Sequence, residues 1–309
     1  MKICLFTDSL ADLPFEGMLD WCAANGLESV ELGTGNFSAS PHLNLAQLLV
    51  SGAARSEFLG AIAQRGIQLS ALNCSGNVLD ASLERRSRSQ QVFYDTLRLA
   101  EALGIQRVVA QSGCPGEGSP TGKFPNWVTS TWQPEYPQLL AYQWKEEVEP
   151  FWREAARSAQ DHGVRIAIEM HPGQVVYNPD TLQRLRQVTG AVVGANLDPS
   201  HLFWQGISPV RVIQVLADAI YHVHIKDCWI DPEEMALNGG LDNRLTGARA
   251  WDHCVPGKGH DEQFWRDFVR SLHVGGYTGD LSIEYAGPPA EVETGIQATV
   301  ALLRASLAR

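Results

Sequence analysis

Eight short apolar runs recur along the chain, and each is followed by a segment with helical periodicity. The runs stay nearly all apolar until their last residues, which is typical of parallel strands covered on both faces. They span residues 2–8, 27–33, 66–73, 105–111, 164–170, 191–198, 221–227 and 280–286. This alternation predicts eight units of a strand followed by a helix.

The segments between the runs carry apolar stripes and recognisable helix ends. In residues 89–104 the apolar positions fall on one face, and Gly104 ends the pattern as a C-terminal cap. Asn178 followed by Pro179 predicts a helix start, because Asn caps well and Pro fits the first helical position. The same reasoning predicts helices over residues 261–272 and near the C-terminus.

The number and order of these units favour an α/β fold with one (β/α)₈ barrel domain over residues 1–309. A doubly wound sheet is the main competitor. That fold usually carries a Gly-rich phosphate loop after its first strand, and residues 6–14, "FTDSLADLP", contain none.

Two connections, about 112–144 and 228–260, exceed the usual loop length. Both follow strand ends that face the C-terminal side of a barrel, where such enzymes keep their chemistry. The first is rich in Trp and Tyr. We expect these loops to be lids or binding loops, or to form a subunit interface in a homo-oligomer.

Charge and cysteine usage narrow the class of protein. The formal net charge of −11 argues against a nucleic-acid partner, which needs a basic face. The six cysteines are scattered without a C-x-x-C pair, as in proteins of a reducing compartment. No stretch approaches a membrane span and the N-terminus lacks a signal-peptide core, so we expect a cytoplasmic protein without a membrane partner.

Four consecutive predicted strands deliver an acid or a histidine to the same end of the barrel. These residues are Glu169, Asp198, His224 and Glu284. Burying them together without a partner would be costly, and a divalent cation removes that cost. Three carboxylates and one imidazole suit Mn²⁺ first, with Mg²⁺, Co²⁺ or Zn²⁺ as alternatives. The competing interpretation is an ion network with Lys or Arg.

Further polar residues flank this set. His171 and His201 are predicted to contact substrate or to orient a neighbouring ligand. Lys226 is either a substrate contact or a solvated charge. Asn73 and Gln111, at the ends of earlier strands, are weaker candidates for substrate binding.

Three other residues receive different expectations. Glu31 ends the second predicted strand and is a weak site candidate. His222 lies a full pleat deeper than His224, so we expect it to pack behind the ligands. Asp227 points to the opposite side and is expected to bond the loop that follows.

Five motifs in order, "IEMHPG", "NLDPSH", "YHVHIKD", "VPGKG" and "LSIEYAG", resemble the sugar isomerase/epimerase superfamily with the xylose isomerase-like barrel. That group contains D-tagatose 3-epimerase, hydroxypyruvate isomerase, inosose dehydratase and endonuclease IV-like proteins. The resemblance implies the same four ligands, with Glu169 and Glu284 doubling as acid/base residues and His201 contacting a carbohydrate substrate.

Two departures from the pattern matter. Endonuclease IV-like enzymes use extra histidines on strands 2 and 3 and an Asp-x-His motif, whereas this chain has Glu31, Asn73 and an adjacent Asp252-His253. The epimerases usually have an Arg soon after the histidine ligand, and here Lys226 stands nearest. The first departure makes DNA repair a poor reading, and the second leaves the substrate contacts open.

The sequence therefore predicts an isomerase or epimerase that acts on a ketose, keto-sugar or related polyol through a metal-stabilised enediolate. The same intermediate can instead expel a β leaving group, which would make the protein a lyase or dehydratase with His171 as base or acid. A barrel that binds a sugar or a partner without catalysis is the third interpretation.

Overall fold

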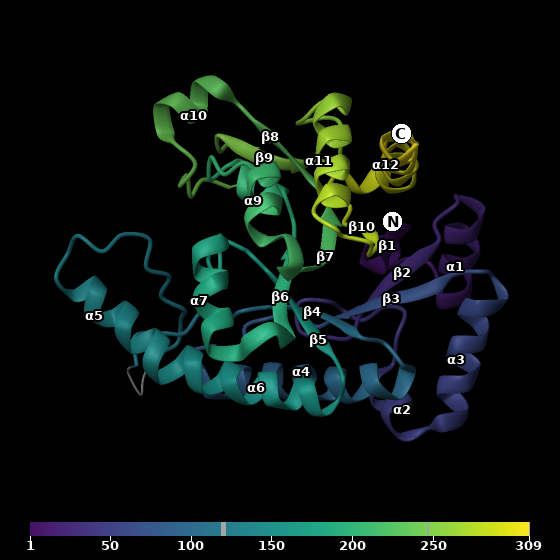
Figure 1. Ribbon diagram of the computed structural model, residues 1–309, viewed down its shortest axis with the longest axis horizontal. Coiled ribbons are helices and arrows are strands. Elements are labelled where there is room, and N and C mark those ends of the chain that lie inside the picture. Colours follow the sequence, from purple (N-terminus) through teal and green to yellow (C-terminus); the bar gives the residue numbers. More distant parts are fainter. Residues whose placement is uncertain (119–121, 246, 309) are drawn as a thin grey trace. The chain divides into compact units, whose positions relative to one another are not determined.

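The structure, a computed structural model, describes residues 1–118, 122–245 and 247–308 (Figure 1). Eight parallel strands close into a barrel in the order β1, β10, β7, β6, β5, β4, β3, β2, so the predicted (β/α)₈ barrel is confirmed. The strands are β1 (Ile3–Phe6), β2 (Ser29–Gly33), β3 (Gln68–Asn73), β4 (Arg107–Gln111), β5 (Arg165–Glu169), β6 (Val193–Leu197), β7 (Ile220–Ile225) and β10 (Leu281–Ile283).

Contacts along the chain group the residues into two compact units. Unit 1 comprises residues 1–31, 60–70 and 197–309, and unit 2 comprises residues 32–59 and 71–196. Helix α3 (Gly52–Gln64) contributes residues to both. Each unit is described by itself below.

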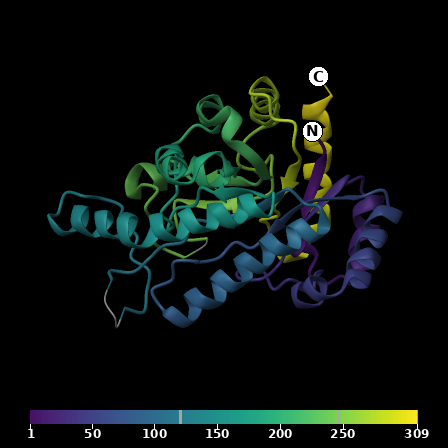
Figure 2. The same ribbon diagram turned by 60° about the horizontal axis from the view of Figure 1, so that its bottom comes forward.

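Unit 2 has a core built from long helices and aromatic rings. Its helices are α2 (Leu45–Val50), α4 (Leu83–Leu103), α5 (Glu135–Tyr142), α6 (Glu149–Asp161) and α7 (Pro179–Thr189). Helices α4 and α6 lie side by side (Figures 1 and 2). Between them the ring of Phe93 meets Trp152 with centroids 5.8 Å apart. Trp152 also donates a hydrogen bond to the carbonyl of Ser112, just after β4, which ties α6 to that strand end.

Unit 1 contains the C-terminal helices. Its helices are α1 (Phe15–Ala24), α8 (Ser200–Phe203), α9 (Pro209–Leu216), α10 (Pro232–Asn238), α11 (Glu262–Val274) and α12 (Val292–Leu307). Helix α11 lies beside α12 and also contacts α9 (Figure 1). Trp265 and Phe268 of α11 and Ile296 of α12 are completely buried, as the apolar stripes predict. Among the described residues, none of the helices combines the length and apolar character needed to span a bilayer.

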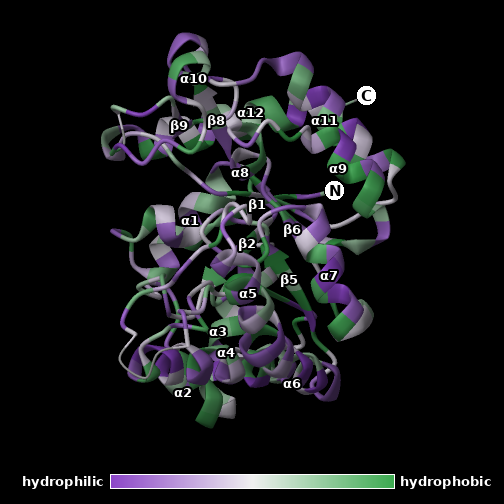
Figure 3. Cartoon of the chain, turned by 90° about the vertical axis from the view of Figure 1, so that its left-hand side faces the viewer, coloured by the Kyte–Doolittle hydropathy of each residue, from purple (hydrophilic) through white to green (hydrophobic). Residues whose placement is uncertain are grey.

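Local sequence signals set the ends of several elements. Gly104 ends α4 in the left-handed conformation, with φ of 71°, as expected for a residue without a Cβ. Asn178 caps α7 by accepting a hydrogen bond from the backbone of Thr181, whose side chain completes a capping box. Figure 3 shows the complementary pattern, with β5 in the green of apolar residues and α6 mainly in purple.

Both long connections contain regular structure that the sequence analysis did not predict. The connection 228–260 is largely an antiparallel hairpin of β8 (Asp227–Ile230) and β9 (Trp251–Cys254) with α10 between them. The connection 112–144 contains α5 and leads into a π-helical segment, η2 (Gln143–Val148). Residues 119–121 and 246, within these predicted loops, lie outside the described residues.

The aromatic residues of the first connection do not share one environment. Trp144 is completely buried, with the Arg184 guanidinium 4.0 Å from its ring centroid. Trp132 is 80% exposed, and Trp127 packs edge-on against Tyr177. Trp144 therefore belongs to the core of unit 2.

Asp227 fixes the base of the β8–β9 hairpin. Its carboxylate is fully buried and accepts hydrogen bonds from the backbone N–H groups of Gly257, Gly259 and His260, each at 3.0 Å. The imidazole Nδ1 of His260 lies 2.7 Å away. A Cβ at Gly259 would lie 2.3 Å from the carbonyl oxygen of Cys228, so the wrap requires glycine. The expectation that Asp227 bonds the following loop is confirmed.

Replacing this carboxylate should loosen the fold. We expect Asp227→Ala to lower the free energy of unfolding by about 3 kcal/mol, because several buried donors lose their acceptor at once. Urea denaturation followed by circular dichroism measures this change. The exposed Asp12→Ala serves as control and should change stability by less than about 0.5 kcal/mol. Equal stability of the two variants would contradict the structural role of Asp227.

Candidate functional site

Three of the four predicted metal ligands lie together in unit 1. Asp198 follows β6, His224 belongs to β7 and Glu284 follows β10. Strands β7 and β10 are hydrogen-bonded neighbours, with Ser282 opposite His224 in the register. One potential ligand atom from each of the three residues lies within 4.8 Å of the others. The C-terminal ends of these strands thus gather two carboxylates and one imidazole.

Lys226 lies beside this group and gives its two carboxylates opposite properties. Its ammonium is 2.7 Å from Glu284 Oε1 and 4.0 Å from Asp198 Oδ2. Burial raises the pKa of the Glu284 carboxyl, but Lys226 and His224 outweigh it and hold that pKa well below its usual value. Burial and the charge of Glu284 together raise the pKa of Asp198 despite Lys226. Glu284 is therefore the stable anion of the group.

Two carboxylate oxygens in this group accept no hydrogen bond although both are buried. These are Asp198 Oδ2 and Glu284 Oε2. The imidazole nitrogens nearest to them are His201 Nε2, at 3.2 Å from Asp198, and His224 Nδ1, at 2.9 Å from Glu284. These contacts have the distance of an ion pair but not the geometry of a hydrogen bond. Buried oxygen lone pairs of this kind suit a bound cation.

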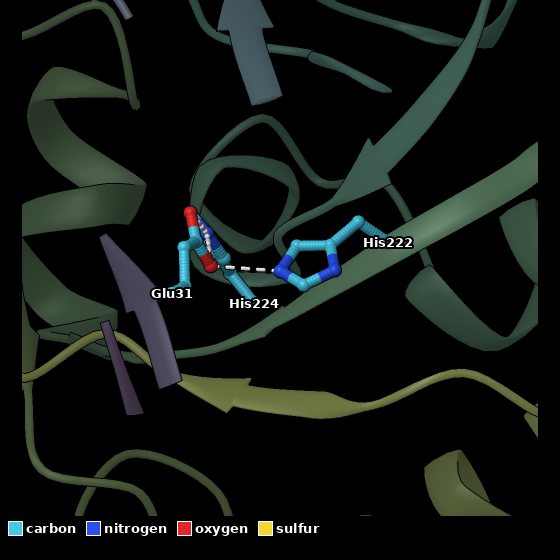
Figure 4. A group of neighbouring side chains, drawn as sticks. All are labelled: Glu31, His222 and His224. Atoms are coloured by element: carbon cyan, nitrogen blue, oxygen red, sulfur yellow. Dashed lines mark hydrogen bonds and ion pairs between the residues drawn. The ribbon is translucent and has the colours of Figure 1, made fainter. Parts of the chain in front are cut away.

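Glu31 lies on the far side of His224 and is completely buried (Figure 4). Its Oε2 is 2.7 Å from His222 Nε2 and also accepts from the hydroxyl of Ser282 at 2.7 Å. His224 Nε2 lies 3.1 Å from both carboxylate oxygens. Burial raises the pKa of Glu31, but His224 and His222 hold it well below the usual value. Glu31 is thus an ionised acceptor shared by two imidazoles.

This arrangement selects the tautomer of His224. An ionised carboxylate only accepts hydrogen bonds, so the Nε2 atom that faces Glu31 carries a proton. A neutral imidazole protonated there presents a lone pair at Nδ1, and that atom faces Glu284 Oε2 at 2.9 Å. Two acceptors that face each other need a proton or a cation near them. A carboxylate behind a histidine is the usual support of a metal ligand.

The structure gives Glu31 a larger role than the sequence analysis did. We expected it to be a weak candidate, yet it holds both histidines of β7 and forms a second group of potential ligands with them. The available signal was the pair His222 and His224 on one face of a buried strand, which requires a buried acid. His222, expected behind the ligands, contacts Glu31.

Glu169, the fourth predicted ligand, lies in unit 2 at the end of β5. It occupies one row of the sheet with Gln111 of β4 and Asn196 of β6. The side-chain amide of Gln111 donates to Glu169 Oε2 at 2.8 Å, and both side chains are buried. Gln111, predicted to bind substrate, thus orients the Glu169 carboxylate.

The remaining candidates have local partners. Asn73 Oδ1 accepts from the backbone of Ser75 at 2.9 Å, as in an Asx turn. His171 Nδ1 lies 2.6 Å from the carbonyl oxygen of Pro172 and its side chain is half-buried. His201 turns its Nε2 toward Asp198. Of the two roles left open for His201, this placement matches the orienting one.

Comparison with known proteins adds a family to this geometry. The model of the family described as xylose isomerase-like TIM barrel matches residues 19–306. The uncharacterized protein YfiH of Bacillus subtilis is 41% identical over 315 residues, which is the full length of both chains. The likeness to YfiH is thus a likeness of whole proteins.

Two further similarities are more distant. An inosose dehydratase of Geobacillus kaustophilus is 31% identical over 154 residues, which cover 50% of this chain and 49% of that protein. The crystal structure of the IolI protein with a bound zinc atom covers 99% of this chain and 98% of its own, with a TM-score of 0.68 and 19% identity. The structural match shows a shared fold, and the dehydratase match extends over about half of either chain.

The contact between Glu31 and His224 can be tested through metal affinity. We expect Glu31→Gln to weaken binding of Mn²⁺ by about 10- to 100-fold, because an amide no longer fixes the tautomer of His224. Isothermal titration calorimetry of the metal-free protein measures this affinity. Glu57→Gln, at an exposed position of α3, is the matched control and should bind as the wild type does. Unchanged affinity in Glu31→Gln would show that Glu31 only supports packing.

Proposed function

Since the chain belongs to the xylose isomerase-like TIM barrel family, we propose that it is a divalent-metal-dependent isomerase or epimerase acting on a ketose, keto-sugar or related polyol. One observation carries this proposal. The His224 Nδ1 lone pair and the buried carboxylate oxygens of Asp198 and Glu284 converge without hydrogen bonds that would satisfy them. These lone pairs fit a cation of intermediate hardness.

Glu169 is the proposed fourth ligand, beside Asp198, His224 and Glu284. Its register partner in β6 is Asn196, and Asp198 follows two residues further along the same chain, on the same face. A divalent cation held there would make a C–H bond beside a chelated carbonyl more acidic and stabilise the enediolate. Mn²⁺ is the first choice, with Mg²⁺, Co²⁺ and Zn²⁺ as alternatives. The zinc in the IolI structure supports a divalent ion.

The protein's own side chains would move the proton. Glu284, kept ionised by Lys226 and His224, is the proposed base that removes a proton from the carbon beside the carbonyl. Glu169, oriented by Gln111, is the proposed partner that returns it. Return to the same carbon from the opposite face gives epimerisation, and return to the neighbouring carbon gives isomerisation.

A dehydratase is the second candidate, and the similarity to inosose dehydratases favours it. Proton removal would proceed in the same way. The electron pair would then form a carbon–carbon double bond as a hydroxyl leaves the β carbon. His171 is the proposed acid that protonates this hydroxyl, so that the group departs as water.

The metal site is tested by elemental analysis. We expect the wild type to bind a single divalent ion per chain and the double variant Asp198→Ala with His224→Ala to lose it, because two of its ligands are gone. Asp12→Ala is the control and should retain the ion. A metal-free wild type after incubation with Mn²⁺, Co²⁺, Mg²⁺ or Zn²⁺ would mean that these residues form an ion network, which contradicts the proposal.

The reaction is tested by proton NMR in D₂O with Mn²⁺, D-tagatose and 2-keto-myo-inositol. Deuterium exchange with a rearranged sugar indicates an isomerase or epimerase, whereas loss of water indicates a dehydratase. We expect Glu169→Gln and Glu284→Gln each to reduce exchange by about 100-fold or more. Wild-type rates in both variants would rule out the enediolate scheme. Absence of exchange with every ketose and keto-polyol would favour a non-catalytic sugar-binding barrel.

A further inference from the structure

His253 is a histidine of the β8–β9 hairpin that none of the proposed steps uses. It lies in β9 opposite Cys228 of β8, within unit 1. Its ring meets the edge of the His201 ring, with centroids 5.2 Å apart and planes at 83°. His201 in turn faces Asp198. The hairpin therefore brings an imidazole next to the group of Asp198, His224 and Glu284.

The hairpin holds this ring by contacts that leave its Nε2 atom free. The indoles of Trp204 and Trp251 stack 4.3 Å apart with nearly parallel planes, and the Arg249 guanidinium lies 3.7 Å from the Trp251 ring centroid. Asp252 accepts hydrogen bonds from the backbone of Gly247 and from Arg249. These neighbours fix the backbone on both sides of His253.

The Nε2 atom of His253 is buried and has no hydrogen-bond partner within the described part of the chain. A buried polar atom in this state costs free energy of about 1–3 kcal/mol. The cost is removed when a ligand supplies the missing partner. Such unsatisfied polar atoms gather at binding sites for this reason.

The surrounding charges keep this imidazole neutral. Burial lowers the pKa of His253 to about 3, and the positive charge of Lys226 adds to the effect, whereas Asp198 and Glu284 oppose it. A neutral imidazole has one donor and one acceptor nitrogen. Its Nε2 can therefore pair in either sense with a hydroxyl, which both donates and accepts.

We propose that His253 Nε2 binds a hydroxyl group of a polyhydroxylated substrate whose reacting carbons lie at Asp198, His224 and Glu284. This inference rests on the proposed function and specifies its substrate class. The ligand carries a further hydroxyl beyond the two oxygens next to the reacting carbons, on the side of the β8–β9 hairpin. His253, rather than His201, supplies the imidazole contact, because the Nε2 of His201 is directed to Asp198.

Two other roles for His253 make different predictions. If the ring only packs against His201 and Trp251, a phenyl ring replaces it without effect on binding. If it is a metal ligand, its removal lowers the metal content. A hydrogen bond to substrate instead predicts weaker substrate binding at unchanged metal content.

The experiment measures binding of 2-keto-myo-inositol and D-tagatose to Mn²⁺-loaded protein by isothermal titration calorimetry. The variants are His253→Phe, which keeps the ring, and His253→Gln, which keeps a polar end. We expect His253→Phe to weaken binding by about tenfold or more and His253→Gln to weaken it less. Metal content should equal that of the wild type in both. His273→Phe, at a position on α11 well along the chain, is the control and should bind normally.

Analogues that each lack one hydroxyl identify the group in contact. For that hydroxyl, its removal and His253→Phe should not be additive, since both delete the same hydrogen bond. Wild-type affinity in His253→Phe, or loss of its metal, overturns this inference and leaves the proposed function in place. Failure of the wild type to bind any ketose or keto-polyol defeats the proposed function, and the inference falls with it.

Discussion

A buried negative charge governs the chemistry at this end of the barrel. Glu31 is fully enclosed, and its ionised form persists because His222, His224 and Ser282 all hydrogen bond to it. By taking the Nε2 proton of His224, it determines which imidazole nitrogen faces Glu284. The ligand character of His224 therefore depends on a residue from a strand nearly two hundred positions earlier in the chain.

The strand that carries His224 divides its polar residues between two tasks. His222, His224 and Lys226 point to one side and meet Glu31 and Glu284. Asp227, of opposite parity, takes the backbone N–H groups of the loop that returns from the β8–β9 hairpin. Period-two alternation thus connects the site and the hairpin through adjacent residues of one strand.

The periodicity of the sequence predicted the barrel well, because every strand run is apolar and every helix carries one stripe. It also predicted that Asp198, His224 and Glu284 would come together, since parallel strands end at the same side of a barrel. The β8–β9 hairpin and the central place of Glu31 were missed. Both depend on contacts between distant segments, such as Trp204 with Trp251, which no local pattern contains.

The clamp on Asp227 also bears on how this fold can diversify. The hairpin is fastened at its base by Asp227 and the glycines of "VPGKG", whereas its outer part, around α10, includes the exposed side chains of Leu237, Leu241 and Leu245. Sequence changes in the outer part leave the anchoring bonds intact. The hairpin can therefore serve as an exchangeable cassette, in which grafting or insertion alters ligand preference while the barrel beneath it keeps its architecture.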